Sequence, residues 1–189
     1  GTPKDLASGD TIYSNVFSVK TQPWLAHHVI YGTVVVPGAT YASMALAAAG
    51  ATVDPGRLPQ SLHAYFIKGG RVGVDVQYVV EITRDGKSFN TRRITASQDG
   101  VPIFEMLASF HRAETTTDWQ RPRGPGVDLR ATTLANPLPE QWADHFEIRT
   151  TGSGMDEWPV QPMWFRSRDP IEDDPLLQAC ALTFISDVG

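Results

Sequence analysis

Apolar side chains occupy every second position of residues 74–82, and polar side chains fill positions 75, 77 and 81 between them. This period of two is typical of a strand with one buried face. Runs rich in β-branched and aromatic residues predict further strands over residues 11–20, 61–68, 88–97 and 101–111. Asp-Gly pairs at 85–86 and 99–100 predict tight turns between the last strands, because glycine accepts a positive φ. The pattern therefore predicts an antiparallel meander.

A single helix is predicted ahead of most of these strands. Residues 39–49 are mainly Ala, with Thr, Tyr, Ser, Met and Leu and no breaker, and Gly50 follows as a C-cap. Residues 33–36 are predicted to be extended, and Pro37-Gly38 leads into the helix. The small side chains of the helix let a sheet wrap closely around it. We therefore expect an α+β fold with an antiparallel sheet curled around one helix. Crossover helices for a parallel sheet do not fit between strands joined by such short turns.

The composition changes after residue 113. Residues 114–157 are rich in Thr, Pro, Arg and Gly and are predicted to form a linker. Short strands are possible at 144–149 and 160–168, and Asp174-Pro175 opens a helix with Asp as N-cap. The predicted division is a first domain over 1–113, the linker, and the start of a second domain of the same kind over 158–189, with its second half truncated.

Charge and composition exclude several classes of protein. The 189 residues include 41% hydrophobic and 20% charged residues, with a formal net charge of -5. A chain of this kind buries a core and lacks the basic stripe of a nucleic-acid-binding protein. The sequence has no run of ~18–20 apolar residues that would cross a membrane. A single cysteine excludes an internal disulfide, so a cytoplasmic location is expected. No metal or other cofactor is expected, because the histidines and the cysteine show no ligand spacing.

Residues 24–38 carry the first chemical signal. His28 is followed by Gly32 four positions later and by Pro37-Gly38 after five more. Over residues 8–49 this spacing resembles the active-site segment of polyketide synthase dehydratase domains. The resemblance implies that His28 is the catalytic base and that Gly32, Pro37 and Gly38 belong to the substrate-binding segment. An imidazole near neutral pKa is suited to removing a proton beside a thioester carbonyl.

A second resemblance covers residues 51–113 and 158–189. The segments 61–66, 84–93, 102–104 and 174–189 look like type II acyl-CoA thioesterases, and this resemblance puts the catalytic aspartate at Asp187. If the helix that opens at Pro175 continues, Asp187 shares a stripe with residues 177, 180 and 184. Its carboxylate is then expected to be desolvated, which suits the activation of a water molecule.

Both families have the hotdog fold and act on acyl thioesters. The resemblances imply a double hotdog and an enzyme without a cofactor, and the favoured function is hydrolysis of acyl-CoA or carrier-bound acyl groups. The alternative is elimination of water from 3-hydroxyacyl carrier-protein thioesters, and a non-catalytic acyl-binding module is the third possibility. Neither family's catalytic set is complete in this sequence. Expected partners are acyl-CoA or an acyl carrier protein, with no nucleic acid or membrane, and a homodimer or higher oligomer is expected because hotdog sheets tend to join at their edges.

Overall fold

The computed structural model describes residues 3–115, 117, 119, 128, 132–134, 146–150 and 163–187. The chain divides into two compact units, and each is described here by itself. The first comprises residues 1–113 and 172–188, and the second comprises residues 114–171 with Gly189. The predicted third part, 158–189, is thereby shared between the units. The division into a first domain, a linker and a second domain stays a prediction, and much of the predicted linker lies outside the described residues.

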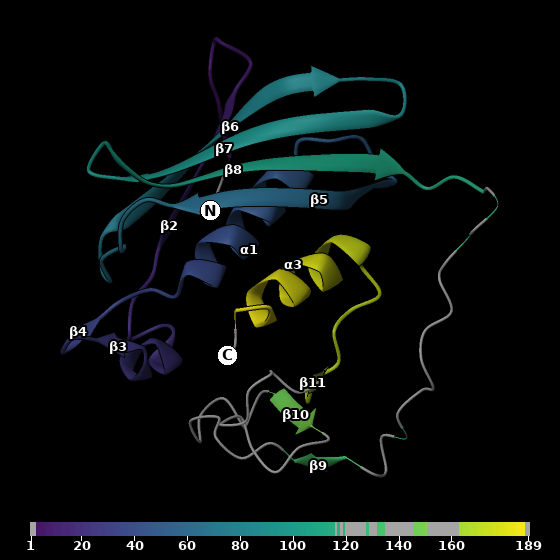
Figure 1. Cartoon of the computed structure of the whole chain (residues 1–189). Coiled ribbons are helices and arrows are strands. Elements are labelled where there is room, and N and C mark those ends of the chain that lie inside the picture. Colours follow the sequence, from purple (N-terminus) through teal and green to yellow (C-terminus); the bar gives the residue numbers. More distant parts are fainter. Residues whose placement is uncertain are drawn as a thin grey trace. The chain divides into compact units, whose positions relative to one another are not determined.

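The first unit is built on a six-stranded antiparallel sheet in the order β1-β2-β6-β7-β8-β5 (Figure 1). Its strands are β1 (Lys4–Asp5), β2 (Thr11–Val16), β5 (Arg57–Phe66), β6 (Asp75–Asp85), β7 (Phe89–Gln98) and β8 (Val101–Arg112). The predicted meander is confirmed, since β6 pairs with β7 and β7 with β8. At the β7–β8 turn, Asp99 and Gly100 have φ values of 49° and 75°. This is the positive φ that the Asp-Gly pair predicts.

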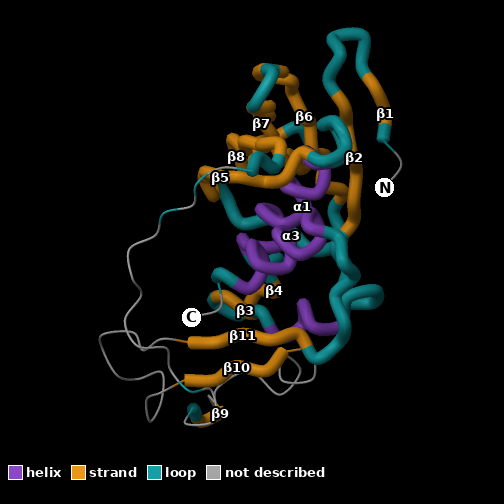
Figure 2. Tube along the Cα trace, turned by 90° about the vertical axis from the view of Figure 1, so that its right-hand side faces the viewer, coloured by secondary structure: helices purple, strands orange, loops and turns teal. Residues whose placement is uncertain are grey.

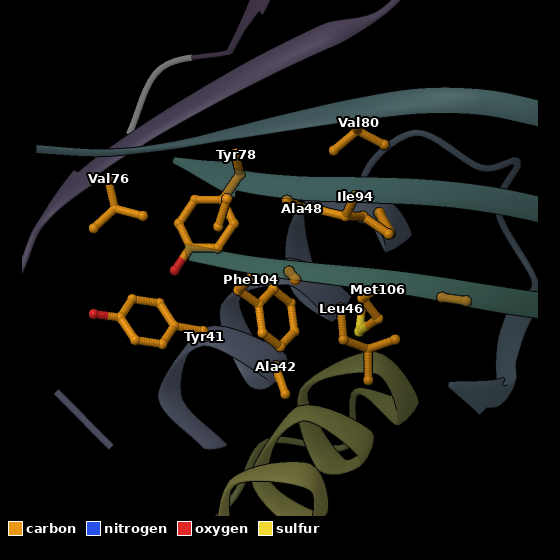
Figure 3. Packing of buried hydrophobic residues seen from close by; sticks show 14 of the residues in the cluster. Tyr41, Ala42, Leu46, Ala48, Val76, Tyr78, Val80, Ile94, Phe104 and Met106 are labelled. Carbon is orange, nitrogen blue, oxygen red and sulfur yellow. The ribbon is translucent and has the colours of Figure 1, made fainter. Parts of the chain in front are cut away.

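Helix α1 (Gly38–Gly50) lies against one face of this sheet. It confirms the helix predicted over 39–49. Ala45 and Ala49 are completely buried, and Leu46 is almost completely buried. Their neighbours in the core are inward-facing residues of the strands, including Val80, Ile94 and Met106 (Figure 3). The small side chains of α1 are what lets the sheet approach the helix, as the sequence indicates.

Helix α3 (Pro175–Ile185) packs on the side of α1 away from the sheet (Figure 2). Ser43 of α1 donates a hydrogen bond of 2.9 Å to the carbonyl oxygen of Cys180. A Cβ atom on Gly50 would lie 2.5 Å from a methyl carbon of Leu176. The end of α1 therefore meets the start of α3, and the two helices run antiparallel. Asp174 caps α3 as predicted, accepting from the amides of residues 176 and 177.

The segment between β2 and α1 contains two elements that the sequence analysis did not predict, ahead of the extended residues predicted at 33–36. Residues Pro23–His27 form a 3-10 helix, η1, and a small hairpin of β3 (Val29–Ile30) and β4 (Thr33–Val34) follows. The hairpin turns at Tyr31 and Gly32, whose φ values are 49° and 78°. Tyrosine rarely adopts a positive φ, so of these two residues only Gly32 indicates a turn in the sequence.

The second unit contains a three-stranded antiparallel sheet in the order β11-β10-β9. Its strands are β9 (Thr133–Leu134), β10 (Phe146–Thr150) and β11 (Met163–Ser167). The last two confirm the short strands predicted near 144–149 and 160–168. Glu147 accepts a hydrogen bond of 2.6 Å from Arg149 and is also paired with Arg166. Hydrogen bonds from Arg149 and then Arg166 lower the pKa of this carboxyl.

Candidate functional site

His28 is held at the junction of η1 and the hairpin by three hydrogen bonds. Its amide donates to the carbonyl of Leu25 at 3.1 Å, and its own carbonyl accepts from the amide of Val35 at 3.0 Å. The ring nitrogen Nδ1 lies 2.7 Å from the carbonyl oxygen of Val35. A carbonyl oxygen only accepts, so Nδ1 carries a proton, and in the neutral imidazole Nε2 then keeps its lone pair. The ring is therefore half-buried and oriented, with Nε2 available as a base.

Gly32 lies at the tip of the β3–β4 hairpin, beside the fully exposed Tyr31. It is exposed, and no atom lies within 4 Å of the place where its Cβ would be. The positive φ of the turn accounts for glycine here. The predicted contact of Gly32 with a substrate carbonyl stays a prediction.

Pro37 and Gly38 form the entry to α1. Pro37 is the N-cap, with φ and ψ of -55° and 140°, and Gly38 is the first helical residue. A Cβ on Gly38 would lie 2.8 Å from a ring carbon of Phe66. Gly38 is therefore required for the packing of this β5 phenyl ring on the helix start. The first amides of a helix have no carbonyl partner within it, so this end of α1 is suited to binding an oxyanion.

The expected burial of Asp187 is wrong. Helix α3 ends at Ile185, Ser186 is its C-cap, and Asp187 is exposed in the turn that follows. The side chain of Ser186 donates to the carbonyl of Thr183, which terminates the helix. Because Asp187 lies past that end, it does not continue the apolar stripe formed by Leu177, Cys180 and Phe184. Its catalytic role stays a prediction.

The antiparallel helices bring the two catalytic candidates to the same end of the helix pair. The end of α3 lies beside the start of α1, and the ring of Phe184 contacts that of Trp24 in η1 edge-on, with centroids 5.7 Å apart. His28 is the C-cap of η1, and Asp187 follows Phe184 by three residues. The contact of Trp24 with Phe184 and the hydrogen bond of His28 to the carbonyl of Val35 were not predictable, because neither depends on a local pattern in the sequence.

The basic residues of the β6–β7 hairpin are mostly engaged within the protein. Arg92 is 1% exposed and pairs with Asp85, and Arg93 pairs with Glu81 and Glu105. Arg92 and Arg93 are two of the four Lys and Arg residues at positions 84–93, and both are paired with carboxylates of the protein.

Two further observations concern the described residues only. They contain no cluster of three or more metal-ligating side chains. None of their helices is long and apolar enough to span a membrane.

Comparison with known proteins supports both resemblances. Residues 22–111 match the family model described as acyl-CoA thioesterase N-terminal domain. The chain is 31% identical to human acyl-coenzyme A thioesterase 8, over 87% of this chain and 58% of the human protein. It is 44% identical to the spectinabilin polyketide synthase system protein NorB of Streptomyces orinoci, over 85% of this chain and 7% of that protein.

Solved structures share the architecture. Acyl-CoA thioesterase II TesB2 from Mycobacterium marinum is 29% identical, with a TM-score of 0.68, over 99% of this chain and 66% of that one. A hot dog fold protein from Alicyclobacillus acidocaldarius has a TM-score of 0.65 at 18% identity, over 96% of this chain and 66% of that one, and so shows the fold alone. The chain thus spans 66% of the length of each of these two structures and 58% of the length of the human relative. With its sheet wrapped around α1, the chain has the hotdog fold, and its residues 22–111 are similar to the N-terminal domain of acyl-CoA thioesterases, with additional similarity to a polyketide synthase.

Proposed function

We propose that this chain provides the acyl-binding and catalytic part of a thioesterase that hydrolyses acyl-CoA or a carrier-bound acyl group. The observation that carries the proposal is the thioesterase-domain match over residues 22–111, which includes α1 and most of the sheet around it. The relatives in this family that match most of the chain are themselves described as acyl-CoA thioesterases.

In the proposed reaction, the Asp187 carboxylate orients a water molecule and accepts its proton. The water oxygen bonds to the thioester carbonyl carbon, the carbon–sulfur bond breaks, and the sulfur leaves as a thiol after taking up a proton. The first amides of α1, at Gly38 and Ala39, would stabilise the oxyanion that develops on the carbonyl oxygen. The exposed position of Asp187 leaves room for water beside its carboxylate.

Hydrolysis is tested by measuring thiol release from acyl-CoA. Asp187→Asn is expected to lower kcat about 100-fold or more, because general-base catalysis typically contributes this much. Asp173→Asn is the matched control, since Asp173 is an exposed acid ahead of the same helix. Full activity of Asp187→Asn would exclude the proposed role, and His28→Ala is expected to keep its activity.

A second candidate function is dehydration of a 3-hydroxyacyl thioester. The observation that favours it is the hydrogen bond between Nδ1 of His28 and the carbonyl of Val35, which leaves Nε2 as a base. In this reaction Nε2 removes the proton from the carbon next to the carbonyl and passes it to the oxygen of the 3-hydroxyl group. The bond from this oxygen to C3 breaks, water leaves, and a double bond forms between C2 and C3. The test is formation of the unsaturated product. If the product is lost in His28→Ala and kept in His27→Ala, a change at the exposed neighbouring residue, dehydration becomes the first-ranked function. Tight binding of acyl-CoA without either product would instead favour a non-catalytic acyl-binding module.

We also propose a cytoplasmic location and self-association. The lone cysteine supports the first, because Cys180 is buried and no internal disulfide is possible. Strand β5 supports the second, because it is the last strand of the sheet and its outer edge is available for pairing with another copy. Light scattering on the purified chain measures its mass, and a monomer over the whole concentration range would contradict self-association.

A further inference from the structure

The loop that follows β5 is attached to the segment that carries His28. Val35 and Arg71 form an antiparallel bridge, and a Cβ on Gly69 would lie 3.6 Å from a methyl carbon of Val35. The carbonyl oxygen of the same Val35 lies 2.7 Å from Nδ1 of His28. The loop and the β3–β4 hairpin therefore lie together beside the start of α1 (Figure 1). Lys68, the residue before Gly69, is thereby placed near the candidate base.

Lys68 is held by its backbone, and its side chain is available to a ligand. The amides of Ile67 and Lys68 both donate to the carbonyl of Ile103, at 3.0 and 3.1 Å, which anchors the end of β5 on β8. Lys68 is exposed, and its ammonium group has no ion pair or hydrogen bond within the part of the chain that the structure describes. Such a cation is accessible at the rim of the candidate site without any rearrangement.

The charged side chains of these two segments have one sign. Residues 17–38 and 67–74, which contain the hairpin and the loop, carry no Asp or Glu and three cations: Lys20, Lys68 and Arg71. Arg71 is paired with Asp99, and the next acid along the chain, Asp75, begins β6 opposite Val16. In a protein with a formal net charge of -5, a region of this kind attracts an anion.

Large apolar side chains are exposed next to Lys68. Phe66 and Ile67 precede it and are 60% and 54% exposed. Ile30 and Tyr31 of the hairpin are 46% and 102% exposed. The rim of the candidate site thus combines an apolar surface with one unpaired cation. This combination suits a ligand whose apolar chain ends in an anionic group.

We propose that Lys68 binds the phosphate group of the pantetheine arm that presents the acyl group. This arm carries the thioester at one end and a phosphate at the other, with amide and methyl groups between them. A thioester bound at the start of α1 therefore leaves the phosphate at the rim, where Lys68 is exposed. The inference rests on the proposed acyl-thioester function. Coenzyme A and carrier proteins share this phosphate, so the contact is the same for either source.

The test measures binding without turnover, by NMR titration of the ¹⁵N-labelled whole chain with 4′-phosphopantetheine and with pantetheine, which lacks the phosphate. The amide signals of Gly69 and Gly70 report on the loop, and that of Gly86 in the β6–β7 turn is the reference. The phosphorylated ligand is expected to bind about fivefold more tightly, because an exposed ion pair contributes about this much. Lys68→Gln is expected to remove the difference, whereas Lys87→Gln, at an exposed lysine in the β6–β7 turn, should preserve it.

Equal affinity of the unmodified chain for the two ligands would overturn the proposal, and so would an equal loss for both ligands in Lys68→Gln. A chain that releases no thiol but still distinguishes the two ligands would contradict only the proposed hydrolysis. Titration with coenzyme A and with an acyl carrier protein that bears the arm separates the two sources. The ligand whose affinity falls in Lys68→Gln is the one whose phosphate is bound, and a fall for neither would also overturn the proposal.

Discussion

A guanidinium group lies almost completely out of water beneath the end of α1. Arg92 donates to both the hydroxyl and the carbonyl of Thr52, at 2.8 Å each, and to a carboxylate oxygen of Asp85 at 2.7 Å. It also donates to the carbonyl of Arg84 at 3.3 Å. These bonds tie the segment after α1 to the β6–β7 turn. Arg92 is therefore a structural residue.

Arg92→Met is expected to lower the free energy of unfolding by about 3 kcal/mol, because it removes the guanidinium that donates to the Thr52 carbonyl and leaves Asp85 with only its hydrogen bond from Asn90. Urea unfolding measures the change. The control is Arg93→Met, since Arg93 is half-exposed and its surface ion pairs contribute about 0–1 kcal/mol. Equal losses in the two variants would show that burial of Arg92 is not the cause.

The pairing of Asp85 predicts a dependence of stability on pH. Hydrogen bonds from Arg92 and then Asn90 lower the pKa of Asp85 in the folded protein. Its contribution is therefore present above the unfolded pKa of about 3.9 and is lost as pH falls through the lowered value. Asp85→Asn is expected to destabilise the protein at pH 7 and to match the wild type at the acid end of a pH 2–7 unfolding series. Asp54→Asn, an exposed acid near the same turn, should show no such convergence.

At the scale of elements, the loop after β5 is fitted to α1 by one glycine. A Cβ on Gly70 would overlap the Tyr41 hydroxyl and lie 3.2 Å from a methyl carbon of Ile103. A Cβ on the preceding Gly69 meets only a methyl carbon of Val35 at 3.6 Å, an ordinary contact. Neither glycine has a positive φ, so an alanine would cause no backbone strain at either site. The two sites differ only in the space available for a Cβ atom.

Gly70→Ala is therefore expected to destabilise the protein by about 1–3 kcal/mol, as overpacking typically does. Gly69→Ala is the matched control and should stay within about 0.5 kcal/mol of the wild type. Thermal unfolding distinguishes them. Adding Tyr41→Phe to Gly70→Ala should restore part of the loss, because it removes the overlapping oxygen.

The elements that follow a local pattern were predictable from the sequence. The period of two identifies β6, the Asp-Gly pair identifies the β7–β8 turn, and Asp174-Pro175 identifies the start of α3. The end of α3 was not predictable, because Ser186 and Asp187 carry no strong stop signal. The fold of η1 and the hairpin also depends on contacts with α1 and α3, which no window of the sequence contains.

At the scale of the whole molecule, α3 joins the unit formed by the first 113 residues. Cys180 lies on its buried side, and burial raises the pKa of this thiol to about 11. The same antiparallel packing brings the ends of η1 and α3 together. The sequence identified His28 and Asp187 separately, but only the packing of two helices more than 120 residues apart places them at one end of the fold.

Labelling of Cys180 with a thiol reagent at pH 8 therefore reports on the docking of α3. Labelling is expected to be on the order of a hundredfold slower in the folded chain than in denaturant, since the thiolate is the reactive form. Leu176→Ala removes a side chain packed against Gly50 and should accelerate labelling, whereas Leu182→Ala, at a 68% exposed position, should not. Fast labelling of the unmodified folded chain would show that α3 does not stay docked.

The order of α1 and its sheet along the chain has a consequence for synthesis. Helix α1 has no charged residue, and the four strands that cover it, β5 to β8, all follow it in sequence. On the ribosome this apolar helix is made before these strands, so its sheet side stays uncovered until residue 112 has emerged, and the side that α3 covers stays exposed until residues 175–185 have followed. Chaperones that bind exposed apolar chain would meet α1 in that interval, so the yield of folded protein depends on how quickly the meander is completed.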